Sequence, residues 1–183
     1  ACLWRCRTIA LGLDHSDQRV RISCSINARG HKHALPRIPS GYYGNAFVFP
    51  AAVSNAKNLC ANPLGYAVEL VKKAKYQVNG DYIKSVADLL VIKGRPLYTT
   101  KWNCIVSDTT RLGMDQIHFG WGKPIYGGPA RAFSLVTPFV RVKNSGGENG
   151  ILVPICLPQP VMERFQQELN KMIQDPAKFT SML

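Results

Sequence analysis

The sequence predicts one mixed α/β domain of 183 residues. Residues 20–27 alternate apolar and polar side chains, which is the period of a strand with one buried face. Residues 64–74 instead space their apolar side chains along one face of a helix. Strands and helices follow one another without regular alternation or internal repeats, as is typical of a mixed α+β arrangement. A hydrophobic content of 46% is enough for one sizeable core.

The first third of the chain predicts a helix, two strands and a long loop. Apolar side chains recur at helical spacing in residues 1–13, with Arg5 outside the stripe formed by Leu3, Cys6, Ala10 and Leu13. No capping side chain precedes this helix, so we expect the natural chain to extend upstream. Strands are expected at residues 20–27 and 46–53, joined by a proline-containing loop at residues 28–45.

The remaining two thirds predict three helices and three strands. Pro63 favours a helix start and Gly94 a helix end, which places helices at residues 63–76 and 80–94. Strands are expected at residues 102–107, 134–142 and 150–157. A glycine-rich segment at residues 143–149 predicts a hairpin between the last two strands. An amphipathic pattern at residues 158–173 predicts a closing helix.

The charge balance predicts an anionic partner. Lys and Arg number 23 against 11 Asp and Glu, a formal net charge of +12. This charge suits nucleic acid, an acidic membrane surface or a phosphorylated small molecule. No apolar run approaches the length that spans a bilayer, so no membrane partner is expected. The six cysteines are scattered and form no Cys-x-x-Cys pair, which predicts reduced and mostly buried thiols.

The segment "FGWGKP" at residues 119–124 predicts a tight turn. Gly120 and Gly122 flank the indole of Trp121, and glycine permits the positive φ angles that such a turn requires. The Gly-Lys pair resembles the end of a phosphate-binding P-loop. That motif would need glycine at Ile117 and serine or threonine at Pro124, so the sequence excludes it.

Other motifs for catalysis, metals and nucleic acid are absent from the sequence. His31 and His33 have no third ligand at suitable spacing, so no metal site is expected. No Gly-x-Ser-x-Gly motif accompanies the four histidines, and no catalytic set is complete within the chain. The sequence has neither a groove-reading motif nor the interleaved exposed aromatics on which bases stack, so no nucleic-acid partner is expected.

Five ordered segments resemble one enzyme family. These are "INARG" at 26–30, "GYYGNAF" at 41–47, "VSDTTRLG" at 106–113, "FGWGKP" with "IYGGPA" at 119–130, and "ENGILVPICLP" at 148–158. Together they resemble the C-terminal half of plant BAHD acyl-CoA-dependent acyltransferases across nearly the whole chain. Residues 63–75, 82–96 and 148–158 are most similar to the benzyl alcohol O-benzoyltransferases.

The resemblance implies a chloramphenicol-acetyltransferase-like fold, with residues 1–183 as its C-terminal domain. It implies an alcohol O-acyltransferase that moves an acyl group, in this case benzoyl, from CoA to an alcohol such as benzyl alcohol. Acyl-CoA would be a co-substrate, no cofactor would be bound permanently, and the complete enzyme would be monomeric. The family's general base lies in a His-x-x-x-Asp-Gly motif, and no histidine here has Asp four residues later. We therefore expect the catalytic histidine in a missing N-terminal domain and an inactive fragment.

Three residues are candidates for substrate or CoA binding. Lys123 could bind a CoA phosphate through its ammonium group or be an ordinary solvated lysine. Trp121 could line the channel near the thioester or pack in the core. Asn45 could donate a hydrogen bond to substrate or hold its own turn. The lysines at 72, 73 and 75 are interpreted as the solvated face of a helix.

The remaining motif residues have an expected structural role. The family motif begins with Asp, which is replaced here by His118 ahead of Phe119, Gly120 and Gly122. In the family that Asp pairs with an arginine that maps to Arg29. Because imidazole cannot form the bidentate pair that a carboxylate forms with arginine, we expect a weaker joint between the two loops.

Two further expectations concern alternatives and location. The chain could instead be a truncated, non-catalytic module that binds CoA-like anions or another protein. Its final residues, Ser181, Met182 and Leu183, approximate the Ser-Lys-Leu peroxisomal address. A peroxisomal location is therefore expected, with the cytoplasm as the alternative.

Overall fold

The computed structural model describes residues 1–29, 38–94, 101–144 and 146–174. Its strands are β1 (Arg19–Cys24), β2 (Ile26–Asn27), β3 (Phe47–Val48), β4 (Ala51–Asn55), β5 (Asn103–Asp108), β6 (Val136–Lys143) and β7 (Asn149–Leu152). Its helices are α1 (Cys2–Ala10), α2 (Ala56–Ala61), α3 (Leu64–Tyr76), α4 (Gly80–Lys93) and α5 (Gln159–Gln174), with a 3₁₀ turn, η1, at Met114–Gln116.

Five strands form a mixed sheet in the order β4-β1-β5-β6-β7. The three central strands are parallel, with Ile22 opposite Cys104 and Val106 opposite Thr137. The edge strands β4 and β7 pair antiparallel with β1 and β6. This mixed sheet with helices packed on it confirms the predicted fold class.

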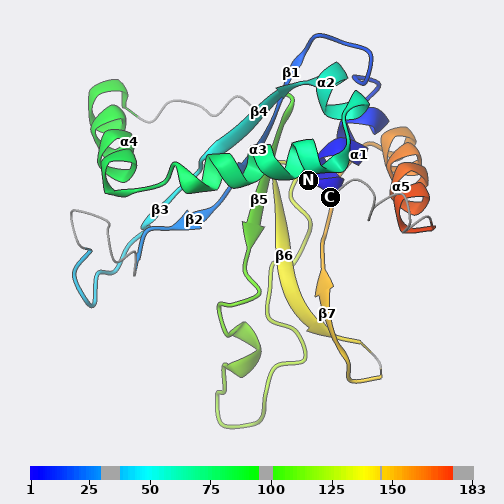
Figure 1. Ribbon diagram of the computed structural model, residues 1–183. Helices are drawn as coiled ribbons and strands as arrows, with labels where there is room; N and C mark the ends of the chain where they lie inside the picture. The colour runs from blue at the N-terminus through cyan, green and yellow to red at the C-terminus, as the bar shows by residue number, and fades with distance from the viewer. Residues whose placement is uncertain (30–37, 95–100, 145, 175–183) are drawn as a thin grey trace.

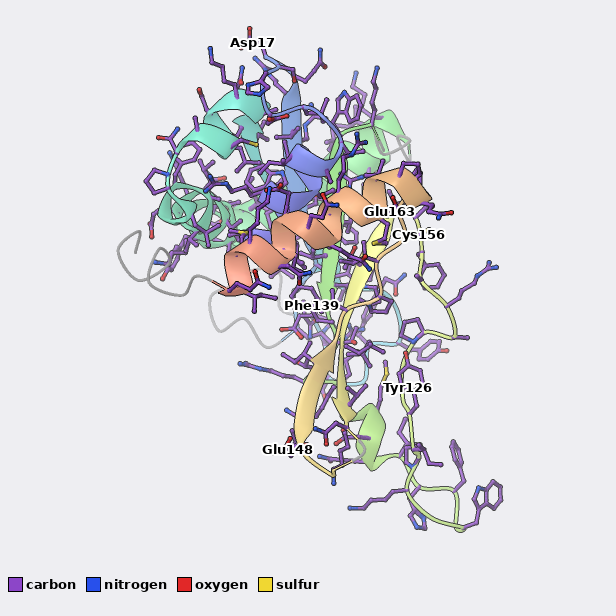
Figure 2. The ribbon with its side chains drawn as sticks, turned by 90° about the vertical axis from the view of Figure 1, so that its right-hand side faces the viewer. Asp17, Tyr126, Phe139, Glu148, Cys156 and Glu163 are labelled. Atoms are coloured by element: carbon purple, nitrogen blue, oxygen red, sulfur yellow. The ribbon has the colours of Figure 1, made fainter. Side chains whose placement is uncertain are left out.

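Helix α1 lies between two apolar clusters because its buried side chains point in two directions. Trp4 packs into the main core with Val20 and Ile22 of β1 and with residues of α2 and α3. Cys6 and Ala10 pack instead against α5, where Phe165 is the central side chain. Figure 2 shows α5 running across α1 on this side of the molecule. The predicted stripe through Cys6 and Ala10 is therefore the contact with α5.

Arg5, outside the predicted stripe, ties α1 to α2. Its guanidinium donates hydrogen bonds to the carbonyl oxygens of Cys60 at 2.6 Å and Asn62 at 3.1 Å. These carbonyls belong to the end of α2, where backbone acceptors lack helical partners. At the other end of α2, the Asn55 side chain accepts a hydrogen bond from Lys57 N. The short helix is thus capped at both ends.

Helix α4 stands apart from the sheet and exposes apolar side chains. Figure 1 shows it at the left end, away from the other helices. Leu89, Leu90, Val91 and Ile92 are 43–84% exposed, and Gly80 is the helix's one buried residue. A helix with this much exposed apolar surface is unusual in a protein without a partner.

The sequence located most elements but missed some boundaries. The helix after Pro63, the Gly94 stop and the hairpin between β6 and β7 are confirmed. Helix α2 was not predicted. The single strands expected at residues 20–27 and 46–53 are each divided, into β1 and β2 and into β3 and β4. The strand predicted at residues 150–157 ends earlier, at Leu152.

Candidate functional site

The loop between β5 and β6 folds back on itself where Gly127 packs closely against Met114. A Cβ atom added at Gly127 would lie 2.7 Å from Met114 Cβ and 3.0 Å from the Met114 carbonyl oxygen. Because no other residue fits this approach without movement, Gly127 fixes η1 against the returning loop. Figure 2 shows this loop, with Tyr126, alongside the hairpin that carries Glu148.

A basic pocket of about 620 Å³ lies between this loop and the hairpin, and we call it the hairpin pocket. Lys123 lines it from the loop, and Arg141 and Lys143 line it from β6. Asp115 of η1 is the carboxylate in its lining. Successive side chains of a strand alternate between faces, so Arg141 and Lys143 lie on the same face of β6. Three cations and one carboxylate make the pocket suitable for a polyanion.

A second pocket of about 620 Å³ lies at the carboxyl ends of β1 and β5, and we call it the strand-end pocket. Lys72 and Lys75 of α3 line it together with Asp108 and Arg111. The Lys72 ammonium is paired with Glu69 Oε1 at 2.8 Å. Both linings contain three cations and one carboxylate, but in the strand-end pocket one of the cations, Lys72, is paired with a carboxylate outside the lining.

Asp108 is held in its ionised form within the strand-end pocket. Hydrogen bonds from Thr110 lower the pKa of this carboxyl, chiefly through the hydroxyl at 2.6 Å from Oδ1 and also through the backbone N–H at 3.0 Å. The nearby charges of Arg111 and Lys75 act in the same direction. Asp108 is thus a fixed negative charge at neutral pH and is not suited to be a general base there.

The predicted turn at residues 119–124 is present, but its aromatic rings are exposed. Gly120 and Gly122 have φ angles of 103° and 128°, which confirms the need for glycine. Trp121 is 88% exposed and contacts the Phe119 ring at a centroid distance of 6.3 Å. Core packing of Trp121, one of the two alternatives, is therefore wrong for this chain. Lys123 lines the hairpin pocket and is exposed, so phosphate binding and ordinary solvation both stay open for it.

The structure does not bring Arg29 and His118 together. The Arg29 guanidinium donates to the carbonyl oxygens of Gly44 and, at 3.4 Å, Tyr42, and lies over the Tyr42 ring. His118 Nδ1 instead accepts a hydrogen bond from Gly120 N at 3.0 Å. Each side chain is bound within its own loop, and the described residues show no direct contact between Arg29 and His118. Asn45 is exposed, and within the described ranges its side chain makes no hydrogen bond.

The six cysteines are free, as expected, but fewer are buried than predicted. Cys6 and Cys104 are buried, Cys156 is exposed, and the others are half-buried. Burial raises the pKa of Cys60 to about 11. The interaction between the neighbouring Cys2 and Cys6 side chains lowers the pKa of Cys2 to about 7 and raises that of Cys6.

The described residues contain no other recognisable centre. No three His, Cys, Asp or Glu side chains of the described ranges gather as metal ligands. Among the described helices, none has the length and apolar character needed to cross a bilayer. The His31 and His33 pair lies outside the described residues.

Comparison with known proteins identifies the family. A family model described as "Transferase family" matches residues 1–172. The chain belongs to this family. Alcohol acyltransferase 16 of Actinidia chinensis var. chinensis is 61% identical over 175 residues, and Alcohol acyl transferase 2 of Malus domestica is 57% identical over 177 residues. Each match covers 96% of this chain but 38% of the relative, so the chain spans less than half of these curated relatives.

Solved structures that resemble this Transferase-family member support the fold. Vinorine synthase aligns with a TM-score of 0.65 at 14% identity, over 92% of this chain and 39% of its own. F. sporotrichioides TRI101, complexed with coenzyme A and T-2, aligns with the same TM-score at 18% identity, over 92% and 41%. These likenesses, together with the alcohol acyltransferase relatives, support the BAHD resemblance and the chloramphenicol-acetyltransferase-like fold.

Sequence reasoning missed four pocket residues, which are Lys75, Arg111, Arg141 and Lys143. The alternation in "VRVK" at residues 140–143 places Arg141 and Lys143 on one face and could have indicated a basic strand surface. Their convergence with Lys123 depends on the path of the intervening loop. Nothing in the local sequence gives that path.

Proposed function

We propose that the chain is the C-terminal part of a longer enzyme that transfers an acyl group from a CoA thioester to an alcohol. The family match, the names of the relatives and the chain's 38% share of their length support this proposal. A histidine in the remainder of the protein would accept the hydroxyl proton as the alcohol oxygen attacks the thioester carbonyl. The described residues then act in binding the acyl carrier and in closing the reaction channel.

The hairpin pocket is the observation that carries the proposal. CoA is a polyanion, and phosphate groups favour sites where several lysine or arginine side chains converge. Lys123, Arg141 and Lys143 converge here from two segments, with Asp115 as the opposing carboxylate. We place the CoA phosphates in this pocket and not in the strand-end pocket, where one of the three cations, Lys72, is already paired with Glu69.

The exposed apolar surface of α4 supports a partner domain. Val91 is 84% exposed and Ile92 is 75% exposed, and burying such side chains against another surface is favourable. The segment that covers them would belong to the remaining part of the same protein, since relatives extend well beyond this chain. Trp121 is also exposed, and a channel formed with that segment could use its indole to contact substrate.

We further propose benzoyl-CoA as acyl donor and benzyl alcohol as acceptor. The support is the similarity of residues 63–75, 82–96 and 148–158 to benzyl alcohol O-benzoyltransferases.

A peroxisomal location stays a proposal, because Ser181, Met182 and Leu183 lie outside the described residues. Fluorescent fusions with and without Leu183 test it, and an unchanged distribution would contradict it.

The CoA site is tested by charge removal in a chimera. In this chimera the chain replaces the matching stretch of Alcohol acyltransferase 16, which supplies the remainder of the enzyme. The variant Lys123→Gln with Arg141→Gln removes two positive charges from the hairpin pocket. The matched control, Lys75→Gln with Arg111→Gln, removes two from the strand-end pocket.

We expect the KM for acyl-CoA to rise about ten-fold or more in the hairpin variant, since each charge-assisted contact contributes on the order of 1 kcal/mol or more. The kcat should change little, because these contacts are remote from the reacting atoms. The control should retain its KM. A larger rise in the control would move the CoA phosphates to the strand-end pocket, and no rise in either would refute both placements.

A further inference from the structure

Three sulfur atoms from the two ends of the chain meet where α1 packs on α5. Cys6 Sγ donates a hydrogen bond to Met172 Sδ at 3.1 Å, and Cys2 Sγ donates to the same sulfur at 3.3 Å. Cys2 and Cys6 lie four residues apart on α1 and therefore share one face of the helix. Both thiol sulfurs therefore lie against the same thioether sulfur.

The sulfur cluster, formed by Cys2, Cys6 and Met172, is buried on one side and reachable from solvent on the other. Cys6 is fully buried, and Ala10 and Phe165 pack around it. Cys2 and Met172 are half-buried, which leaves a route from solvent. Figure 1 places α1 and α5 away from the loop and hairpin that form the hairpin pocket. The acyl-transfer function proposed above makes no use of these sulfurs.

We propose that Cys2, Cys6 and Met172 form a binding site for one Cu(I) ion. Thiolate and thioether sulfurs are soft ligands that select Cu(I), whereas Mg²⁺ and Ca²⁺ prefer oxygen. Structural Zn²⁺ takes four protein ligands, and this cluster offers three. This inference departs from the sequence-based expectation of no metal site, because that expectation did not include a methionine ligand.

The charge of the site is accounted for by the release of two protons. On binding, two S–Cu bonds replace two S–H bonds and two protons leave to solvent, while the thioether coordinates unchanged and copper stays in the +1 state. Two thiolates and one Cu(I) carry a net charge of −1. The positive charge of Arg5 acts on both thiols and would offset that charge, although Glu168 near Cys6 opposes it.

The site is tested with Cu(I) itself under anaerobic conditions, in the 183-residue chain. All proteins carry Cys156→Ser, because that thiol is exposed and could bind copper alone. Affinity is measured by competition with a chromophoric Cu(I) chelator, and the number of sulfur neighbours by X-ray absorption. Met172→Leu and Cys2→Ser each remove one ligand, and Cys60→Ser is the matched control, a half-buried cysteine outside the cluster.

We expect one equivalent of Cu(I) with three sulfur neighbours in the parent chain and in the control. Each ligand variant should have two sulfur neighbours and about ten-fold or more weaker binding, since even indirect changes to a metal site cost 10- to 100-fold. Met172→Leu conserves side-chain volume, and circular dichroism verifies its fold. Equal affinity in the parent and both ligand variants would overturn the proposal, as would two sulfur neighbours in the parent.

Discussion

The exposed end of α4 gives a quantitative prediction for assembly with the remaining part of the enzyme. The perturbation is Val91→Ser with Ile92→Ser. Complete burial of a valine or isoleucine side chain contributes about 1.5–3 kcal/mol. Because Val91 is 84% and Ile92 is 75% exposed, most of that free energy is still available to a partner surface. The double variant should therefore weaken assembly by about 2–5 kcal/mol, which is roughly 30- to 3000-fold in Kd.

Isothermal titration calorimetry can measure this effect with the segment of Alcohol acyltransferase 16 that lies outside the match. The stability of the chain itself should change little, because both side chains are mostly exposed and serine has a helix propensity similar to those of valine and isoleucine. The control Ile173→Ser removes a 64% exposed isoleucine from α5, a different helix. An equal loss of affinity in the control, or no loss in the α4 variant, would refute the assignment of α4 to the interface.

Two further predictions concern the loop and the strand-end pocket. Thr110→Val removes the strongest hydrogen bond to Asp108, so NMR titration should show the pKa of that carboxyl rising toward its ordinary value. The Thr110–Asp108 hydrogen bond stabilises the fold above the pKa that Asp108 has in the unfolded chain, and this stabilisation is lost as the pH falls through the lowered pKa of the folded state. An unchanged Asp108 titration in Thr110→Val would be evidence against the hydrogen bond. Gly127→Ala forces a Cβ atom against Met114 and should lower the melting temperature by several degrees, whereas Gly150→Ala, with no atom closer than 3.9 Å, should not. Equal melting temperatures would contradict the packing of the loop.

Helix positions could be predicted where the sequence has both periodicity and end signals. Pro63 and Gly94 mark the start of α3 and the end of α4, and both boundaries are confirmed. Helix α2 has six residues, too few for a clear period, and its one usable signal was Asn55 as the N-terminal cap. Pro154 lies just beyond β7 and is consistent with the earlier end of that strand, since proline cannot donate to a ladder.

The candidate site was less predictable because it depends on long-range geometry. Lys123 was a candidate from its local motif, but its neighbours Arg141 and Lys143 come from a strand after a long loop. A weaker joint between the loops of Arg29 and His118 is expected from the family motif alone. In the structure each side chain has a nearer partner, Gly44 for Arg29 and Gly120 for His118, and local geometry prevails.

Ester formation by the chimera with Alcohol acyltransferase 16 tests the proposed function most directly. Benzoyl-CoA and benzyl alcohol are supplied, and benzyl benzoate is measured against reactions with heat-denatured chimera and with the 183-residue chain alone. We predict ester from the folded chimera and none from the chain alone, because the proposed function places the catalytic histidine in the remainder of the enzyme. A folded chimera that binds benzoyl-CoA but forms no ester with any alcohol or acyl-CoA tested would contradict the proposed function.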